Sequence, residues 1–316
     1  MDDNLDYYLL QLQNMLIWKT YETSPYEIFT KICGEKEREI YKLPYFPDRI
    51  LHWAIIQQVE PIFLKKLNGC THSAIPERGI HSAFKQVDKY MTKDVEGTKY
   101  CLKMDVRKFY PSISHKLLKE MYRTIFKDKD LLWLLDEIID STEGDRGVPI
   151  GNYLSQYSGN LFLSKFDRWL KEIKGVKYYT RYMDDIVIFH KDKQYLHELF
   201  KEIGHYLNNK LDLDVKDNWQ VFPSRVRGVD FVGYRHFGSY VLLRKTTSKR
   251  LVRKMRDITK KLNCGGELNF TDYCSINSYK GWLIWCNGHN LYSKWIKPLE
   301  PYCDKYHKEV IKNEGV

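Results

Sequence analysis

The sequence predicts an α+β fold in which helices are combined with antiparallel strands. Residues from Lys177 to Phe189 are rich in aromatic and β-branched types around an Asp-Asp turn, which is typical of an antiparallel hairpin. Residues from Leu5 to Trp18 carry leucines and aromatics at helical spacing. From Thr246 onward the pattern is mainly helical and basic.

The N-terminal part is predicted to combine helices with short strands. Ser24-Pro25 ends the pattern of the first helix, and Tyr26 to Tyr41 indicates short strands. Phe46 to Ile50 opens a second helix that continues to Phe63. Turns and a further helix are expected at Gly69, Pro76 to Gly79 and His81 to Tyr90.

The central part carries the remaining strands. Tyr100 to Asp105 is predicted to be a strand, followed by a helix that begins near Ser114. The glycine-rich loop from Glu143 to Gly151 leads into one long helix, Ser155 to Ile173, before the hairpin. Beyond the hairpin we expect a helix at Leu196 to Leu207 and strands at Leu211 to Val215 and Asp230 to Tyr234.

Composition indicates a folded protein with a basic C-terminal part. Hydrophobic residues make up 43% of the 316 residues and aromatics 15%, which excludes a disordered chain. The formal net charge is +10, and residues 241–316 hold 15 Lys and Arg against 7 Asp and Glu, a net +8. Because most of the excess lies in the last quarter, we expect a module there that grips a polyanion.

Cysteine usage and the N-terminus indicate a reduced, cytoplasmic compartment. The seven cysteines are scattered without a Cys-x-x-Cys pair, so neither a disulfide framework nor a zinc site is predicted. The start Met1-Asp2-Asp3 is acidic, and no apolar run approaches the roughly 18 residues of a membrane span. We therefore expect no membrane partner.

Two adjacent carboxylates, Asp184 and Asp185, lie at the tip of the predicted hairpin. A turn alone favours Asp-Gly or Asn-Gly, and two neighbouring aspartates repel each other. The repulsion is relieved if the pair faces Mg²⁺, which prefers oxygen ligands. Taken by itself, the pair is equally compatible with a solvated turn.

Asp105 ends a predicted strand 79 residues before Asp184. A β-α-β-β order of this kind can bring Asp105, Asp184 and Asp185 to one sheet surface. Three aspartates around two Mg²⁺ ions, for which Mn²⁺ can substitute, suit phosphoryl transfer. One ion lowers the pKa of the attacking hydroxyl, and the other neutralises the triphosphate and the leaving pyrophosphate.

The flanks of these aspartates carry a family resemblance. Asp105 to Tyr110, Gly147 to Gln156 and Tyr182 to Asp185 resemble, in that order, the palm motifs of reverse transcriptases, and Gly228 to Tyr234 resembles their primer-grip hairpin. The resemblance implies a right-hand polymerase fold whose palm is an antiparallel sheet backed by helices. Its parts would be fingers with the N-terminal helix at 1–95, a palm at 96–240 with which part of the fingers can interleave, and a helical, basic thumb at 241–316.

The resemblance also implies roles for individual residues. Asp105, Asp184 and Asp185 would be catalytic and, with Val106, would form the metal site. Tyr110 matches the aromatic gate that excludes a ribose 2′-hydroxyl, with a core tyrosine as the alternative. Lys36 and Arg38 match the Lys-x-Arg that holds the incoming triphosphate, with an ordinary exposed strand as the alternative. Ile150, Gly151 and Gln156 would complete the nucleotide site. Phe231, Gly233 and Tyr234 would form the primer grip. The contacts with nucleic acid would come from Arg78, Arg146, Arg244, Lys245, Lys249, Arg250, Arg253 and Lys254.

The segment from Ile150 to Gln156 indicates one group within the reverse transcriptases. Many relatives have glutamine in place of Ile150 and Ser-Pro in place of Ser155-Gln156. Ile-Gly-x-x-x-Ser-Gln is instead similar to the reverse transcriptases of diversity-generating retroelements, in the bacterial and phage lineage that resembles group II introns. The segment from Gly281 to Tyr292 looks like that group's thumb.

This resemblance implies an enzyme that copies a template RNA into cDNA from dNTPs, with frequent errors opposite adenine. It also implies a partner, a small basic accessory variability protein that forms an oligomeric ring. An amide at position 150 could orient the incoming nucleotide, whereas the alkyl group of Ile150 only packs. Losing about 1–3 kcal/mol of discrimination is worth about 10–200-fold in selectivity.

Two other interpretations share much of this pattern. An antiviral-defence or retron-type reverse transcriptase has the same chemistry and a different biological output, although retron enzymes carry other residues in the metal hairpin. A catalytically inactive RNA-binding scaffold belongs to a different class. Retention of all three aspartates argues against a scaffold, because buried carboxylates without a metal are costly.

Overall fold

The structure is a computed structural model that describes residues 4–33 and 36–313, with side chains described for 4–32 and 37–308. The chain forms two compact units. Unit 1 comprises Met1–Ala83, Leu102–Phe189 and Lys193–Val221. Unit 2 comprises Phe84–Cys101, His190–Asp192 and Phe222–Val316. No helix in the described ranges is both long and apolar enough to cross a membrane.

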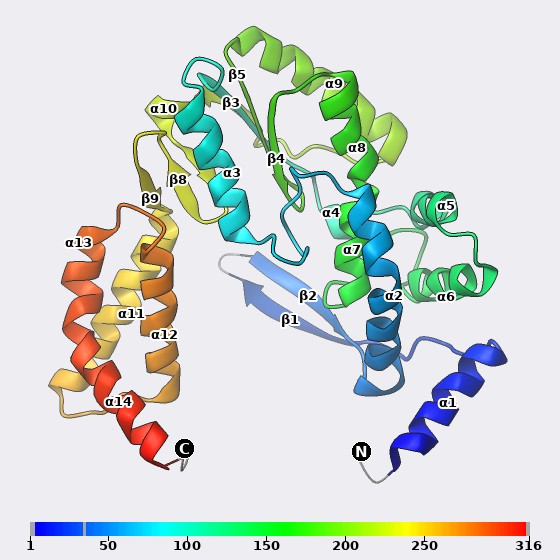
Figure 1. The fold of residues 1–316 in the computed structure, drawn as a ribbon, viewed down its shortest axis with the longest axis horizontal. Coiled ribbons are helices and arrows are strands. Elements are labelled where there is room, and N and C mark those ends of the chain that lie inside the picture. Colours follow the sequence, from blue (N-terminus) through cyan, green and yellow to red (C-terminus); the bar gives the residue numbers. More distant parts are fainter. Residues whose placement is uncertain (1–3, 34–35, 314–316) are drawn as a thin grey trace. The chain divides into compact units, whose positions relative to one another are not determined.

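Unit 1 combines helices with antiparallel strands (Figure 1). Its α-helices are α1 (Leu5–Ile17), α2 (Ile50–Lys66), α4 (Phe109–Ser112), α5 (His115–Ile125), α6 (Lys129–Asp140), α7 (Tyr153–Phe162), α8 (Ser164–Arg168) and α9 (Lys193–Leu211). Two π-helical turns, Tyr45–Arg49 and Trp169–Ile173, adjoin α2 and α8. Its strands are β1 (Glu27–Cys33), β2 (Lys36–Lys42) and β4 (Tyr178–Tyr182), while β3 (Tyr100–Asp105), β5 (Asp185–His190) and β6 (Gln220–Pro223) cross the unit boundary.

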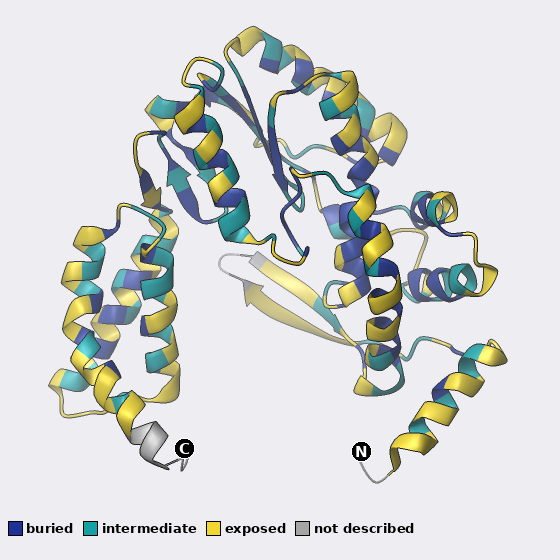
Figure 2. Cartoon of the chain, in the orientation of Figure 1, coloured by how far each residue is buried: buried dark blue, intermediate teal, exposed yellow. Residues whose placement is uncertain are grey.

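The main sheet has the strand order β4-β5-β3-β6. In the antiparallel pair β4 and β5, Tyr182 lies opposite Asp185, so Met183 and Asp184 form a two-residue turn as the hairpin pattern predicts. Ile186 to Phe189 expose at most 1% of their side chains. An uninterrupted apolar run of this kind is typical of a strand covered on both faces, as the dark central strands in Figure 2 illustrate.

Two segments differ from the sequence prediction. The single long helix predicted at 155–173 is broken at Leu163, which is the C-cap of α7 and the N-cap of α8. Leu163, Phe166 and Leu170 are all fully buried, so the apolar spacing continues across the break and hides it. The strand predicted at Leu211 to Val215 is wrong, because α9 runs to Leu211 and only one isolated bridge, Val106 to Val215, follows.

Unit 2 contains a small sheet and a helical C-terminal part (Figure 1). Its elements are most of α3 (Ile80–Lys93), α10 (Ser224–Arg227), β7 (Val229–Phe231), β8 (Tyr234–His236), β9 (Val241–Leu243), α11 (Lys245–Asn263), α12 (Phe270–Leu283), α13 (His289–Leu291), a π-helical turn (Tyr292–Ile296), a 3₁₀ turn (Lys297–Leu299) and α14 (Glu300–Asn313). Leu251, Met255 and Ile258 on one face of α11 pack with Ile276 of α12 into one core. The predicted helical character after Thr246 is confirmed.

Candidate active site

Asp105 and Asp184, two of the predicted metal ligands, form an acidic pair. Asp105 ends β3 and Asp184 occupies the β4–β5 turn, and both side chains are half-buried. Burial, a hydrogen bond with Asp105 and the charge of Asp105 together raise the pKa of Asp184 well above the ordinary aspartate value. Two carboxylates close enough to share a proton can exchange that proton for a divalent cation. The pair therefore fits a hard metal ion such as Mg²⁺.

Two lysines accompany the aspartates. Lys216 Nζ lies 3.2 Å from Asp105 Oδ2, and Lys103 Nζ lies 3.3 Å from Asp185 Oδ2. Asp185 is thus engaged with Lys103. Across the residues that the structure describes, no three His, Cys, Asp or Glu side chains are grouped closely enough to hold one ion. Asp105 and Asp184 are the two carboxylates that share a hydrogen bond, while Val106 is buried opposite Val215.

Tyr110 lies beside the hairpin turn. It belongs to α4, and its hydroxyl is 3.5 Å from Met183 Sδ. Burial and then the charge of Asp184 raise the pKa of Tyr110, whereas the positive charges of Arg181 and Arg38 oppose that rise. A Cβ added at Gly159 of α7 would lie 3.2 Å from the Phe109 ring and 3.6 Å from that of Tyr110. A glycine at that position therefore lets α7 approach both rings closely.

The loop that carries Ile150 is joined to β2. Tyr41 N donates to Ile150 O at 2.9 Å. Gly151 has φ +127°, and a Cβ there would lie 2.7 Å from Tyr41 O, so no side chain fits at this position. Ile150 is half-buried and Arg38 of β2 is exposed. The structure thus brings Ile150 and Gly151 next to the strand that carries Arg38.

Among the described side chains, Gln156, Arg78 and Arg146 make no hydrogen bond or ion pair with Asp105 or Asp184. Lys36 begins β2, but its side chain lies outside the described residues. Gln156 is exposed on α7. Arg78 Nη1 donates to Asn68 O at 2.9 Å and so braces a loop, while exposed Arg146 pairs with Asp212.

In unit 2, the predicted primer grip is a tight hairpin with buried side chains. Phe231 lies opposite Tyr234, and both are fully buried. Val232 and Gly233 form the turn with φ +43° and +91°. A Cβ at Gly233 would lie 2.5 Å from the Trp282 ring. Phe231 and Tyr234 therefore support the hairpin from its core.

The six basic residues predicted to contact nucleic acid around α11 fall into two groups. Arg244 pairs with Asp230 at 2.5 Å, and Lys254 pairs with Asp272 at 2.9 Å. The other four are exposed and have no acidic partner among the described residues: Lys245, Lys249, Arg250 and Arg253. These four are available to an external polyanion.

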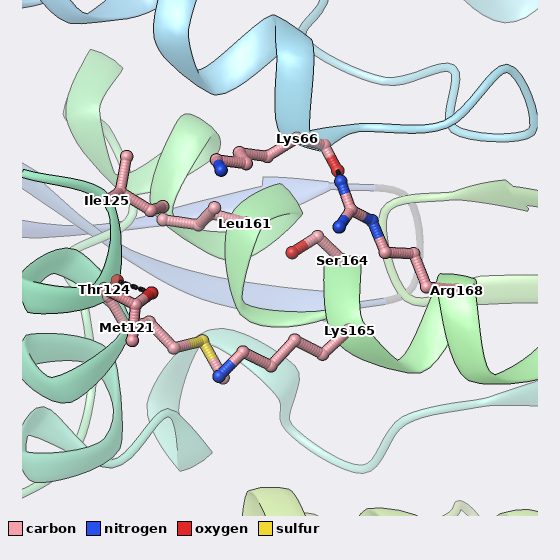
Figure 3. Close-up of a pocket in the computed structure, with 8 residues that line it drawn as sticks. All are labelled: Lys66, Met121, Thr124, Ile125, Leu161, Ser164, Lys165 and Arg168. Atoms are coloured by element: carbon pink, nitrogen blue, oxygen red, sulfur yellow. Dashed lines mark hydrogen bonds between the residues drawn. The ribbon is translucent and has the colours of Figure 1, made fainter.

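A separate cavity of about 230 Å³ lies among α2, α5, α7 and α8. Figure 3 shows Arg168 directed toward the carbonyl group of Lys66, and the two are 3.5 Å apart. The other lining residues are Met121, Thr124, Ile125, Leu161, Ser164 and Lys165. None of the predicted site residues lines it.

Several residues of the site were not singled out from the sequence. Lys103 and Lys216 meet the aspartates from sequence separations of 82 and 111 residues, which no local motif announces. Arg181 is fully buried next to the turn. One feature of the sequence indicates its burial. Arg181 follows Tyr179 by two residues in an apolar strand, so its charged side chain points to the same inward face of the sheet.

Comparison with known proteins identifies the family. The family described as reverse transcriptase (RNA-dependent DNA polymerase) matches residues 34–236, which is more than half of the chain. YkfC of Escherichia coli is 25% identical over 223 residues, covering 66% of this chain and 51% of YkfC. The group II intron-encoded protein LtrA of Lactococcus lactis is 21% identical over 173 residues, covering 52% of this chain and 28% of LtrA.

Solved structures show the same fold. Apo telomerase from Candida tropicalis superposes with a TM-score of 0.57 at 13% identity, covering 80% of this chain and 53% of that one. Candida albicans telomerase in complex with a fragment of telomeric RNA gives 0.51 at 13% identity, covering 76% and 52%. The chain thus spans about half the length of these structures and of YkfC, and 28% of LtrA. The mixed α+β architecture is the right-hand polymerase fold, and the chain belongs to the reverse transcriptase family.

Proposed function

We propose that this protein is an RNA-directed DNA polymerase that copies a template RNA into cDNA by two-metal-ion nucleotidyl transfer. The observation that carries the proposal is the half-buried, hydrogen-bonded pair of Asp105 and Asp184, whose mutual repulsion a divalent cation would relieve. Membership of the reverse transcriptase family supports it. Template RNA, cDNA and dNTPs are the proposed ligands.

Each site residue then has a proposed task. Asp105 and Asp184 hold the ions, with Asp185 and the Val106 backbone assisting. Bound Mg²⁺ would lower the pKa of a primer 3′-hydroxyl and neutralise charge on the triphosphate. Tyr110, which lies beside the turn, excludes a ribose 2′-hydroxyl by its bulk.

The remaining predicted residues bind the phosphates and the nucleic acid. Lys36 and Arg38 bind the triphosphate through charge-assisted hydrogen bonds. Ile150, Gly151 and Gln156 complete the nucleotide site, and Arg78 and Arg146 lie toward the template. The exposed cations of α11 follow the phosphates of the duplex, while Phe231, Gly233 and Tyr234 shape the primer grip. This division corresponds to fingers at 1–95, palm at 96–240 and thumb at 241–316.

The finer proposal is a diversity-generating retroelement enzyme. Its support is the Ile-Gly-x-x-x-Ser-Gln segment and the placement of half-buried Ile150 next to β2. The alkyl side chain of Ile150 offers no hydrogen bond to an incoming nucleotide, which predicts low selectivity opposite template adenine. A small basic accessory protein ring is the proposed partner, and scattered free cysteines support a cytoplasmic setting.

Primer extension on an adenine-rich RNA template with Mg²⁺ and dNTPs tests this function. Wild type, Asp184→Asn and Ile150→Gln are compared, with the accessory ring protein added where a neighbouring gene supplies one. We expect Mg²⁺-dependent cDNA with errors at template adenine, no cDNA from Asp184→Asn, and fewer adenine errors from Ile150→Gln. Faithful cDNA would favour a defence or retron enzyme. No synthesis under any condition would favour an inactive RNA-binding scaffold.

A further inference from the structure

A wholly buried ion pair adjoins the hairpin turn in unit 1. Arg181 of β4 and Asp167 of α8 expose 0% and 1% of their side chains. The contact is bidentate, because Arg181 Nε lies 2.9 Å from Asp167 Oδ1 and Nη2 lies 2.6 Å from Oδ2. A planar guanidinium fork is suited to this geometry, and a lysine ammonium is not.

The guanidinium of Arg181 also reaches the metal hairpin. Its Nη1 donates to Met183 O at 2.8 Å and to Asn160 Oδ1 at 3.3 Å, and its Nη2 reaches Thr71 Oγ1 at 3.3 Å. With the two bonds to Asp167, every N–H of the side chain has an acceptor. Asp167 is equally occupied, because Thr71 Oγ1 and the Tyr179 hydroxyl also donate to it.

The backbone of Arg181 is held from the outer edge of the sheet. Arg181 N donates to Cys70 O at 2.8 Å, and His72 N donates to Arg181 O at 3.1 Å. These two bonds form a parallel bridge between Thr71 and Arg181. Arg78 in turn braces the same loop through Asn68 O. Both the main chain and the side chain of Arg181 are therefore fixed.

This network restrains the peptide that begins the catalytic turn. Met183 has φ +54°, a left-handed backbone conformation that residues other than glycine disfavour. The bond from Arg181 fixes the carbonyl of Met183, which is half of the peptide that continues into Asp184. A buried ion pair adds little stability over a well-packed apolar pair, because desolvation offsets the attraction. Stability alone is thus a poor reason for its presence.

We propose that Arg181, anchored by Asp167, is a positioning residue that sets the Met183–Asp184 peptide so that the Asp184 carboxylate meets Asp105. The proposal rests on the proposed polymerase function for its kinetic consequence. Its structural consequence is independent of activity, because a misplaced Asp184 also weakens binding of a divalent cation.

Three variants of the full chain test the proposal. Arg181→Lys keeps the charge and loses the fork. Arg181→Met combined with Asp167→Leu removes both charges and therefore leaves no unpaired buried charge. This double variant keeps the proposal testable if Arg181→Lys folds poorly. Tyr122→Phe is the control, because it removes one buried hydrogen bond, to Ser158 at 2.6 Å, away from the hairpin. Mn²⁺ binding is titrated by electron paramagnetic resonance, and kcat and KM for dNTP are measured by primer extension.

We expect both Arg181 variants to bind Mn²⁺ about tenfold more weakly than wild type and to lose about a hundredfold in kcat, with KM for dNTP unchanged. Tyr122→Phe should change only the melting temperature. Wild-type Mn²⁺ affinity and wild-type kcat in the folded double variant would overturn the proposal. If wild type extends no primer, the polymerase proposal fails while the Mn²⁺ titration still decides this one. Equal Mn²⁺ binding by wild type and Arg181→Lys would then reject it.

Discussion

The ammonium nitrogen of Lys216 lies 3.2 Å from Oδ2 of Asp105. A similar distance, 3.3 Å, separates Lys103 Nζ from Asp185 Oδ2. Both lysine side chains are about one-third exposed, at 36% and 27%, so solvent screens each pair. Each lysine supplies positive charge that a bound metal ion would otherwise supply to the same carboxylate.

Removing Lys216 is expected to strengthen metal binding. Lys216→Met eliminates a cation that competes for Asp105, and a solvent-screened, half-buried pair of this kind contributes about 1 kcal/mol. The Mg²⁺ concentration for half-maximal primer extension should fall by about twofold to fivefold. Lys174→Met is a matched control, since Lys174 pairs with Glu202 at 2.8 Å and has similar exposure. An increase in the half-saturating Mg²⁺ concentration would show that Lys216 helps the metal.

The acidic pair predicts a pH-dependent stability of the metal-free protein. Because the pKa of Asp184 is raised in the folded state, the folded protein keeps a proton that the unfolded chain releases. The contribution of Asp184 to the free energy of unfolding therefore falls as pH rises from the ordinary aspartate pKa through the raised one. The slope is at most about 1.4 kcal/mol per pH unit.

Thermal melting between pH 4 and pH 8, with and without Mg²⁺, measures this effect. Asp184→Asn should be more stable than metal-free wild type at pH 8, and the gap between the two proteins should shrink toward pH 4. Mg²⁺ should raise the melting temperature of wild type at pH 8 more than at pH 5, because protons compete with it at low pH. A variant that is less stable than wild type at pH 8 without metal would contradict this reading of the pair.

Tyr110 is expected to control the choice between deoxyribonucleotides and ribonucleotides. Tyr110→Val removes the ring beside the turn, so the ratio of kcat/KM for dNTP over NTP should fall at least about tenfold. Tyr110→Phe keeps the ring and loses only the hydroxyl contact with Met183 Sδ, so it should retain most of the discrimination. Equal losses in the two variants would assign the effect to the hydroxyl instead.

The exposed cations of α11 are expected to carry duplex binding. Lys249→Ala combined with Arg253→Ala should weaken binding to a primer–template duplex and reduce the slope of log K against log salt by about 2. Lys254→Ala is the control, because that lysine is already paired with Asp272. Fluorescence anisotropy across a salt series makes the comparison. A change in slope for Lys254→Ala as large as for the double variant would argue against a role specific to the exposed face.

The parts of the site that depend on local pattern were predictable from the sequence. The strand ending at Asp105 and the turn at Asp184 follow from strand composition and hairpin spacing. The positions of Lys216 and Arg181 were not predictable, because each depends on contacts with residues distant in the chain. The prediction of a strand at Leu211 to Val215 was wrong for a related reason. Leu211 and Leu213 are buried two residues apart, as in a strand, although a helix ends there.

The most direct test is single-nucleotide incorporation on an RNA template, measured at increasing Mg²⁺ in wild type and Asp184→Asn. We predict Mg²⁺-dependent addition by wild type and a rate at least about a hundredfold lower in Asp184→Asn, with unchanged affinity for the primer–template. Addition by Asp184→Asn at the wild-type rate would contradict the central role of the Asp105 and Asp184 pair. So would a wild-type protein that binds the primer–template and adds no nucleotide with Mg²⁺ or Mn²⁺.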